Sequence, residues 1–150
     1  MEYIYNDGGR AGAGYKGDAG DCAVRAIAIA SGKPYQEIYD AINLLAKSEH
    51  RGKRKHGISN ARTGVYSQTI RKYLSSIGFE WTPTMAIGQG CKVHLRASEL
   101  PAGRLVVNVS KHYTAVVDGV IYDTHNPARG GTRCVYGYHK KAEEAKKCQG

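Results

Sequence analysis

Three residues spread over the chain could together perform nucleophilic catalysis: Cys22, His112 and Asp123. In such a site a thiolate attacks an acyl carbon, and an imidazole keeps the thiol ionised and later protonates the leaving group. A third polar group fixes the tautomer of the imidazole. Each residue type also has an ordinary structural role, since a lone cysteine is often just a small buried hydrophobe. The hypothesis therefore depends on whether the fold brings the three side chains together.

Cys22 lies where a glycine-rich segment gives way to a run of alanine and isoleucine. Asp21 occupies the N-cap position and Gly32 follows the run, so we predict a helix from Cys22 to Ser31. Small and apolar residues surround most of its circumference, which predicts a buried central helix with Arg25 as the exception. A helix N-terminus favours the thiolate and lowers the pKa of a thiol placed there.

His112 and Asp123 lie on two β-prone runs, 112–117 and 120–124, that are joined by Asp118-Gly119. A two-residue type I′ turn at this dipeptide would place opposite each other the residues whose numbers sum to 237. His112 would then share one face of the hairpin with Asp123, since side chains alternate across a strand. The two side chains would be diagonal neighbours, close enough for the carboxylate to reach the imidazole. His125 would lie directly opposite His112.

Helical patterns precede the strands along the chain, which predicts an α+β fold. We expect further helices from about Pro34 and from about 66 to 77, because apolar residues recur there every three or four positions. Strands are predicted at 3–5, 79–82, 105–110, 112–117, 120–124 and 132–138. The expected architecture packs the central helix that carries Cys22 on a C-terminal antiparallel sheet. The 150 residues suit a single domain, 1–150, with a glycine-rich lead-in at 1–20.

Five basic residues and no acidic residue lie between positions 51 and 62 of a predicted loop over residues 48–64, so five of the nine excess charges could come from this stretch. A polyanion or an acidic protein could bind this loop, although a solvated connection is the favoured interpretation. We expect a second basic segment, 140–150, to be a solvated helical tail. The basic residues of the loop are Arg51, Lys53, Arg54, Lys55 and Arg62.

The four cysteines are widely spaced, with no CxxC pair, so the sequence predicts neither a zinc site nor a redox dithiol. The first residues lack the basic and apolar regions of a signal peptide, and no apolar run approaches the length of a membrane span. We therefore expect a cytoplasmic protein with reduced thiols and no membrane association.

The arrangement of these residues resembles the papain-like superfamily of cysteine hydrolases. In that superfamily a glycine-rich segment leads to a catalytic cysteine at the start of a central helix, and a later antiparallel sheet supplies a histidine and then an aspartate or asparagine. The segments Gly20-Asp21-Cys22-Ala23-Val24-Arg25-Ala26 and Ser31-Gly32-Lys33-Pro34-Tyr35 are also similar to small uncharacterised bacteriophage and prophage proteins. The resemblance implies a papain-like domain that needs no cofactor, acts on a peptide or protein and, if phage-encoded, works in the host cytoplasm.

One feature of the superfamily is missing. Its members usually place a glutamine shortly before the cysteine as an oxyanion donor, but residues 15–21 contain none. The backbone N–H of Cys22 can supply one donor, and Lys16 is the candidate for a second. Asp21 and Asn126 are further candidates to line the site.

His125 offers an alternative third catalytic residue, since cell-wall amidases of the superfamily often begin with Asp-Cys and use a second histidine. We favour Asp123, because a carboxylate both orients the imidazole and stabilises its positive form. A metal site built from His112, Asp123 and His125 is conceivable. No helix-spaced histidine pair or cysteine pair supports it, and we predict no metal.

The sequence thus favours a cysteine hydrolase that cleaves an amide, isopeptide or thioester bond. Cys22 would be the nucleophile, His112 the general base and acid, and Asp123 the orienting carboxylate. Two alternatives stay open. One is a basic module that binds nucleic acid or an acidic protein and carries an inert pseudo-triad; as a partner of the protein, nucleic acid is less favoured than a peptide or protein substrate. The other is an acyltransferase or transglutaminase-like enzyme with the same triad. The sequence does not specify an oligomeric state.

Overall fold

The computed structural model describes residues 1–16, 20–49, 59–86 and 88–142, and within them the α+β class is confirmed. The helices are α1 (Cys22–Ser31), α2 (Tyr35–Ala46) and α3 (Ser67–Ser76). The strands are β1 (Glu2–Tyr5), β2 (Phe79–Pro83), β3 (Arg104–Val109), β4 (His112–Val117), β5 (Val120–Asp123) and β6 (Val135–Lys141). No helix of the described residues combines the length and the hydropathy needed to span a bilayer.

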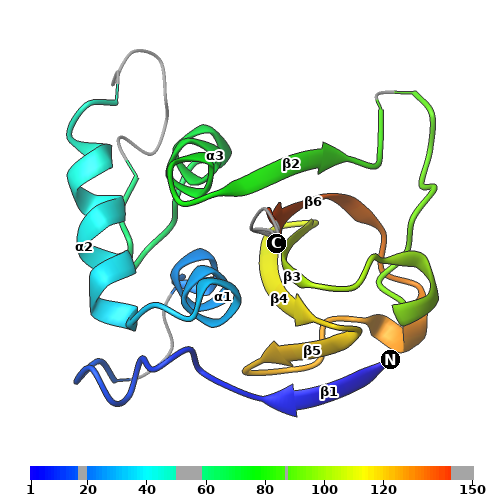
Figure 1. Cartoon of the computed structure of the whole chain (residues 1–150), viewed down its shortest axis with the longest axis horizontal. Coiled ribbons are helices and arrows are strands. Elements are labelled where there is room, and N and C mark those ends of the chain that lie inside the picture. The colour runs from blue at the N-terminus through cyan, green and yellow to red at the C-terminus, as the bar shows by residue number, and fades with distance from the viewer. Residues whose placement is uncertain (17–19, 50–58, 87, 143–150) are drawn as a thin grey trace, which may run out of the picture.

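Helix α1 lies at the centre of the molecule, between α2 and the sheet (Figure 1). Val24 and Ile27 have no exposed surface, as the apolar circumference of the helix predicted. Gly32 ends the helix in a left-handed conformation, with a φ of 75°, and its N–H donates to the carbonyl of Ala28 at 3.0 Å. Arg25, the expected polar exception, is also buried. Its charge therefore requires partners inside the protein.

The other two helices bury the stripes that their sequences predicted. In α2, Ile38 and Ile42 have no exposed surface, and in α3 the same holds for Ile70 and Leu74. Helix α2 packs against α1 and α3, while α3 also packs against β2. The helices thus form a layer that covers one side of the sheet (Figure 1).

The described strands form one mixed sheet in the order β1-β5-β4-β3-β6-β2. The strands after residue 78 pair antiparallel, as predicted. Strand β1, however, is added at the edge parallel to β5, with Tyr3 opposite Ile121 and Tyr5 opposite Asp123. The sequence predicted a short strand at 3–5 but not its direction, and its parallel pairing makes the sheet mixed. A short isolated strand can pair in either direction, and its local pattern does not specify which.

Alternation of side chains along the central strands produces a hydrophobic core on each face of the sheet. Val106 and Ala115 pack against the helices. Val107, Val116 and Ile121 point to the opposite face, where they join a second buried cluster. The central strands are therefore buried on both faces, and their ends form a rigid support for the residues placed there.

Strand β6 begins and ends later than the predicted run 132–138, and it includes Lys140 and Lys141. Both lysines were expected in a solvated helical tail. Lys140 instead lies opposite Glu80 of β2. The prediction of a helical tail failed because strand β2, distant in the sequence, supplies hydrogen-bonding partners for the backbone of Lys140 and Lys141. A run of lysines gives no sign of such a pairing. The rest of the predicted tail, 143–150, lies outside the described residues.

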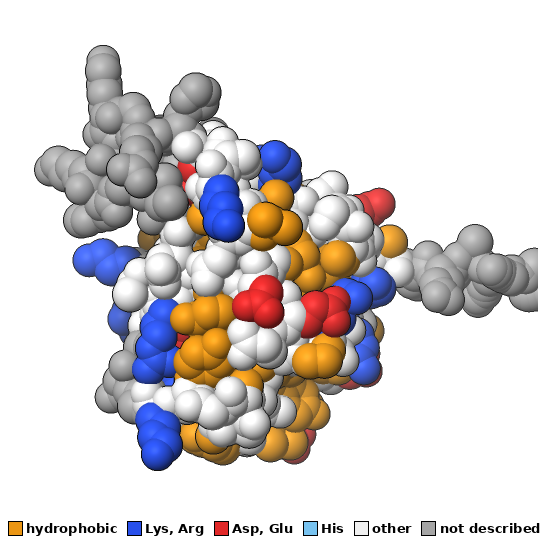
Figure 2. All heavy atoms as spheres, turned by 90° about the vertical axis from the view of Figure 1, so that its left-hand side faces the viewer, with side chains coloured by type: hydrophobic (Ala, Val, Ile, Leu, Met, Phe, Trp, Pro, Cys, Tyr) orange, Lys and Arg blue, Asp and Glu red, His pale blue; other side chains and the backbone are white. Residues whose placement is uncertain are grey.

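The outer face of the helical layer mixes hydrophobic side chains with charged ones (Figure 2). Leu44 of α2 is 67% exposed. The ring of Tyr15, from the glycine-rich lead-in, stacks on that of Tyr39 in α2 with centroids 4.6 Å apart. Tyr35 packs against both rings. This tyrosine cluster attaches the lead-in to the helical layer.

Candidate active site

Two adjoining clefts meet at Cys22 and His112, the first residues of α1 and β4. Both clefts are also lined by Gly20 and Lys111. The first, which we call the α3-side cleft, has a volume of about 460 Å³. The second, the β1-side cleft, has a volume of about 560 Å³. The start of the central helix and the start of β4 therefore meet at a common hollow, which gives a reactant access to the thiol.

The two clefts have different walls beyond the residues they share. The α3-side cleft is lined by Ala23, Thr63, Gly64, Val65, Ser67, Asn108, Val109, Tyr113 and Tyr136. The β1-side cleft is lined by Tyr5, Arg10, Arg25, Thr124 and His125. Beyond the shared residues, the wall of the α3-side cleft is neutral and partly apolar, whereas the wall of the β1-side cleft carries the positive charges of Arg10 and Arg25.

Gly20 allows the chain to approach the other wall of the α3-side cleft closely. A Cβ atom at this position would lie 2.6 Å from the carbonyl oxygen of Thr63. Real Cβ contacts are never this short, so a larger residue would push the two backbone segments apart. The glycine therefore fixes the distance between the residues before Cys22 and the segment before α3.

The hairpin has the register that Asp118-Gly119 predicted. Asp118 and Gly119 have φ values of 47° and 83°, the signs that a type I′ turn requires. The strand ladder runs with opposed residues summing to 237, for example with Val116 opposite Ile121. The predicted shared face therefore forms, and it carries the side chains that follow.

Asp123 lies within hydrogen-bonding distance of His112, as the register predicted. Its Oδ2 atom is 2.7 Å from His112 Nε2 and also accepts a hydrogen bond of 2.7 Å from the Thr114 hydroxyl. The carboxylate is almost fully buried, and the imidazole is mostly buried. A bond from Nε2 to the carboxylate leaves Nδ1 of the imidazole for the sulfur of Cys22.

The thiol of Cys22 and the imidazole of His112 interact as an acid and base pair. Burial alone would raise the pKa of the Cys22 thiol, but the hydrogen bond to His112, its charge and the backbone N–H of Tyr113 lower the pKa below its ordinary value. Burial would lower the pKa of His112, yet its hydrogen bonds to Asp123 and Cys22 raise it to about 9. These two shifts favour a thiolate beside an imidazolium near neutral pH.

Asp123 is kept ionised despite its burial. Burial would raise the pKa of its carboxyl group, but hydrogen bonds from His112, Thr114 and the backbone N–H of Thr124 lower it. Its second oxygen, Oδ1, accepts from that N–H at 2.7 Å and from Arg25 Nη1 at 3.1 Å. Four donors thus hold the carboxylate in one orientation, and through it the ring of His112.

Arg25 joins the two ends of the site and was missed as a functional residue from the sequence. Its Nε donates to Asp21 at 3.1 Å, and its Nη1 donates to Asp123 at 3.1 Å and to the hydroxyl of Thr124 at 2.7 Å. An arginine four residues after an aspartate, in an otherwise apolar helix, was a signal that could have revealed this role.

Asp21 has a different role from the one predicted. It does occupy the N-cap position of α1, but its side chain makes no capping hydrogen bond. It is fully buried instead, where it accepts bonds from Arg25 and Arg10 at 3.1 Å and from the hydroxyl of Tyr35 at 2.6 Å. Two guanidinium groups attract the carboxylate more strongly than the backbone N–H groups of the helix, which explains the difference.

The remaining predicted site residues separate into two groups. His125 lines the β1-side cleft, and its ring lies 4.9 Å from that of His112 between centroids. Asn126 lines neither cleft, and its side chain accepts a hydrogen bond from the N–H of Ala128. Lys16 also lines neither cleft. The structure therefore brings only His125 to the thiol among these three.

Of the five basic residues predicted to bind a polyanion, Arg62 is the one that lies among the described residues. Nη2 of Arg62 donates to the backbone carbonyl of Lys16 at 2.5 Å, and its guanidinium lies over the ring of Tyr15 at 5.5 Å. These contacts engage the arginine within the protein rather than present it to a partner. The other four basic residues of the predicted loop, Arg51, Lys53, Arg54 and Lys55, lie outside the described residues.

His112, Asp123 and His125 come close enough for a metal site, with one ligand atom from each lying within 4.8 Å of the others. The carboxylate is poorly suited to that role. Each of its oxygens already accepts two hydrogen bonds, and the guanidinium of Arg25 would repel a cation. The donor set therefore fits an orienting carboxylate better than a metal ligand.

Cys91 and Cys134 form a disulfide with Cα atoms 5.8 Å apart. The expectation that all thiols are reduced is therefore wrong for this pair. Residues 43 positions apart in the sequence become neighbours only through the fold, so their spacing did not reveal the bond. Cys22 is the free cysteine of the described residues. Its thiol therefore stays available for chemistry.

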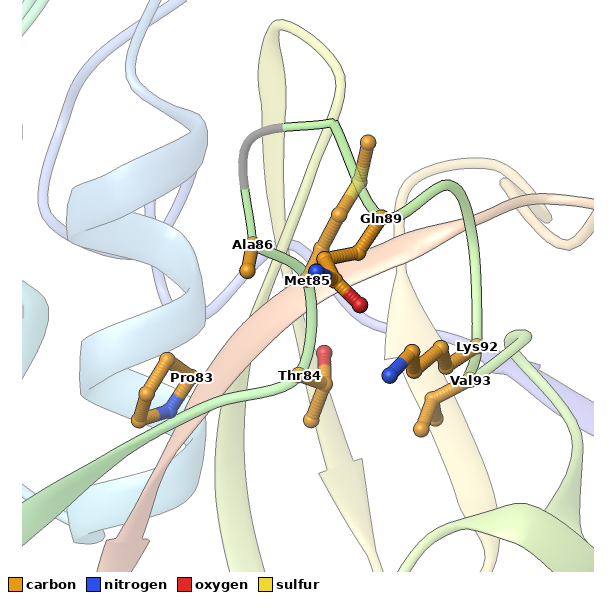
Figure 3. A pocket seen from close by; sticks show the side chains of 7 residues that line it. All are labelled: Pro83, Thr84, Met85, Ala86, Gln89, Lys92 and Val93. Atoms are coloured by element: carbon orange, nitrogen blue, oxygen red, sulfur yellow. The ribbon is translucent and has the colours of Figure 1, made fainter.

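Another hollow of about 450 Å³ lies beyond the end of β2, beside residues 84–86 and 89–93 (Figure 3). Its wall consists of Pro83, Thr84, Met85, Ala86, Gln89, Lys92 and Val93. Its described wall contains neither a cysteine nor a histidine, so these residues lack the groups that nucleophilic catalysis requires.

Comparison of the chain with protein-family models, with curated proteins and with solved structures finds no match. Its class must therefore be argued from the geometry of the site.

Proposed function

We propose that this protein is a cysteine hydrolase that cleaves an amide, isopeptide or thioester bond in a papain-like manner. The observation that carries the proposal is the polarised pair at the cleft: a thiol with a lowered pKa beside an imidazole whose pKa is raised to about 9 by a buried carboxylate. A structural cysteine has no need of either shift, whereas a nucleophile needs both.

Cys22 would attack the acyl carbon of the substrate as a thiolate. The tetrahedral intermediate then collapses as the bond to the leaving group breaks, and the imidazolium of His112 donates its proton to that group. A thioester between the acyl group and Cys22 remains, with neutral His112 beside it. The imidazole next takes a proton from water as the water attacks the thioester. Collapse releases the carboxylic acid and restores the thiolate and the imidazolium.

Two groups of the α3-side cleft would stabilise the oxyanion. The backbone N–H of Cys22 belongs to the first turn of α1, where N–H groups have no partner within the helix. The described lining of this cleft contains one side-chain amide, that of Asn108 on β3, which is half-buried. We assign the second donor to Asn108 in place of Lys16, which does not line the cleft.

The proposal is tested with p-nitrophenyl acetate, an activated ester small enough to enter either cleft. The thiolate should displace p-nitrophenolate and take up one acetyl group at Cys22, which peptide mass spectrometry detects. Water should then release acetate, so that nitrophenolate continues to form after the first turnover. His112→Ala should slow acylation by at least about 100-fold, since general acid and base catalysis is worth that much.

N-acetylcysteine amide serves as the control, because it carries an ordinary thiol with no folded surroundings to lower its pKa. Acetylation of Cys22 no faster than that of N-acetylcysteine amide, or acylation of Cys22 that is unchanged in His112→Ala, would refute the proposal. A matched measurement with added glycine amide tests the acyltransferase alternative. Capture of the acetyl group by the amine in preference to water would favour a transferase over a hydrolase.

A further inference from the structure

We propose that the substrate carries a carboxylate next to the bond that is cleaved, and that the β1-side cleft binds this carboxylate through Lys111 and Arg10. This inference rests on the proposed function, because it concerns the substrate of the same site. It follows from the charge of the cleft, from the partners of its cationic groups and from the backbone at Lys111.

The walls around the thiol carry an excess of positive charge. Lys111, Arg10 and Arg25 line the β1-side cleft, and so do His112 and His125. Among the described residues that line the two clefts there is no aspartate or glutamate. A cleft lined by charge of one sign attracts reactants of the opposite sign.

The buried charges of the site balance one another before Lys111 is counted. Asp21 and Asp123 accept hydrogen bonds from Arg10, Arg25 and His112. With the thiolate added to the two carboxylates, three negative groups balance the three positive ones. The ammonium of Lys111 is therefore surplus to the internal network, and the side chain is exposed. No described acidic residue forms an ion pair with it.

Arg10 has donors left for a ligand. Its Nη1 is bound to Asp21, whereas its Nε and Nη2 have no protein partner among the described residues. A guanidinium that is anchored by one nitrogen and open at the others is pre-organised to bind a carboxylate. Lys111 lines the same cleft, so the two side chains present their positive charge to one hollow.

The backbone at Lys111 supports a functional reason for this residue. Val109 lies opposite His112, so Ser110-Lys111 forms the tight turn between β3 and β4. Lys111 has a φ of 56°, in the left-handed region where glycine or asparagine is preferred. A lysine is an unfavourable choice for the turn itself, and it stands directly before the catalytic histidine. Strained residues of this kind cluster at functional sites.

The two clefts therefore suggest opposite preferences on the two sides of the thiol. The α3-side cleft presents Val65, Tyr113 and Tyr136, which suit an apolar group. The β1-side cleft presents Lys111 and Arg10, which suit an anion. A substrate with an apolar group on one side of the scissile bond and a carboxylate on the other would fill both.

The probe is iodoacetate, compared with neutral iodoacetamide. Both alkylate a thiolate by displacement of iodide, but only iodoacetate carries the carboxylate. At low ionic strength the ratio of the iodoacetate rate to the iodoacetamide rate should be higher at Cys22 than for N-acetylcysteine amide, a thiol without a carboxylate of its own. Lys111→Asn removes the charge and keeps a residue that accepts the left-handed backbone. It should lower the ratio by about threefold or more, the effect of one charge a few ångströms away in a water-like medium.

Two control variants separate this effect from an altered fold. Lys111→Arg should retain the ratio of the wild type, because it preserves the charge. Lys72→Asn, which removes an exposed charge on α3 away from both clefts, should also leave the ratio unchanged. Added salt should reduce the ratio in the wild type, which provides a measurement independent of any variant.

A ratio that is the same in Lys111→Asn and the wild type, or that does not respond to salt, would overturn the carboxylate site. Fast alkylation of Cys22 by iodoacetamide in that case would leave the proposed hydrolase intact. Slow alkylation of Cys22 by both reagents, at the rate of an ordinary thiol, would instead refute the hydrolase itself. The two failures are therefore distinguishable.

Discussion

Replacement of Arg25 by methionine should destabilise the protein strongly, although Arg25 is not itself a reacting group. Arg25 is only 6% exposed, and it donates hydrogen bonds to Asp21, Asp123 and Thr124. Methionine fills a similar volume but donates nothing. It therefore leaves two buried carboxylates with fewer donors, which is a costly change in a medium of low dielectric constant.

The three lost bonds set the expected magnitude. Hydrogen bonds to charged groups contribute about 1.5 kcal/mol or more each, which gives a loss of about 4 to 5 kcal/mol. Removal of one partner of a buried ion pair typically costs about 3 to 5 kcal/mol. The two figures agree, and either is a large fraction of the roughly 5 to 15 kcal/mol that stabilises a typical domain.

Urea unfolding followed by circular dichroism would measure the free energy of unfolding of Arg25→Met. Lys33→Met is the matched control, because Lys33 forms an exposed ion pair with Glu37 at 3.3 Å. That pair should contribute less than about 1 kcal/mol. A loss below 1 kcal/mol in Arg25→Met, equal to that of the control, would refute the argument that the buried network holds the site together.

Three further predictions concern single groups of the site. In the wild type the raised pKa of His112 and the lowered pKa of Cys22 have opposite effects on stability as the pH rises toward 9, because the folded chain holds a proton on His112 and the unfolded chain holds one on Cys22. Cys22→Ala removes the proton of the unfolded state. In this variant the raised pKa of His112 stabilises the fold fully below pH 6.5, and this stabilisation is lost as the pH rises above that value. The urea midpoint of Cys22→Ala should therefore fall as the pH rises above 6.5, and a flat profile would contradict the raised pKa of His112. Gly20→Ala should slow alkylation of Cys22 and destabilise the fold, because its Cβ would meet the Thr63 carbonyl at 2.6 Å; unchanged alkylation and unfolding would contradict the close approach. Asn108→Ala should lower kcat for p-nitrophenyl acetate by about 100-fold with little change in KM, as expected for an oxyanion donor, and an unaltered kcat would remove that role.

The local elements of the site could be predicted from the sequence because their signals are local. Cys22 to Ser31 is bounded by an N-cap residue and by Gly32, and the helix has those bounds. Asp118-Gly119 specifies both the turn and its length. The register of the hairpin follows from these two residues, and the register places Asp123 beside His112.

Contacts between distant segments could not be predicted in the same way. Asp21 was assigned to the helix cap, since the sequence gives no sign that Arg10 and Tyr35 lie beside it. The parallel pairing of β1 with β5 depends on how the lead-in crosses the molecule. The disulfide of Cys91 and Cys134 likewise depends on the path of the chain between β2 and β6. In each case the partner is selected by the fold rather than by neighbours in the sequence.

The central claim is that Cys22 is a nucleophile activated by His112. The most direct test is the rate of alkylation of Cys22 by iodoacetamide as a function of pH, in the wild type and in His112→Ala. The wild-type rate should reach half of its maximum below pH 9.0, the ordinary pKa of a thiol, and His112→Ala should move that midpoint to a higher pH, because burial raises the pKa of the thiol and the hydrogen bond and charge of His112 no longer oppose it. A wild-type midpoint at the ordinary value, or the same midpoint in both proteins, would contradict the account.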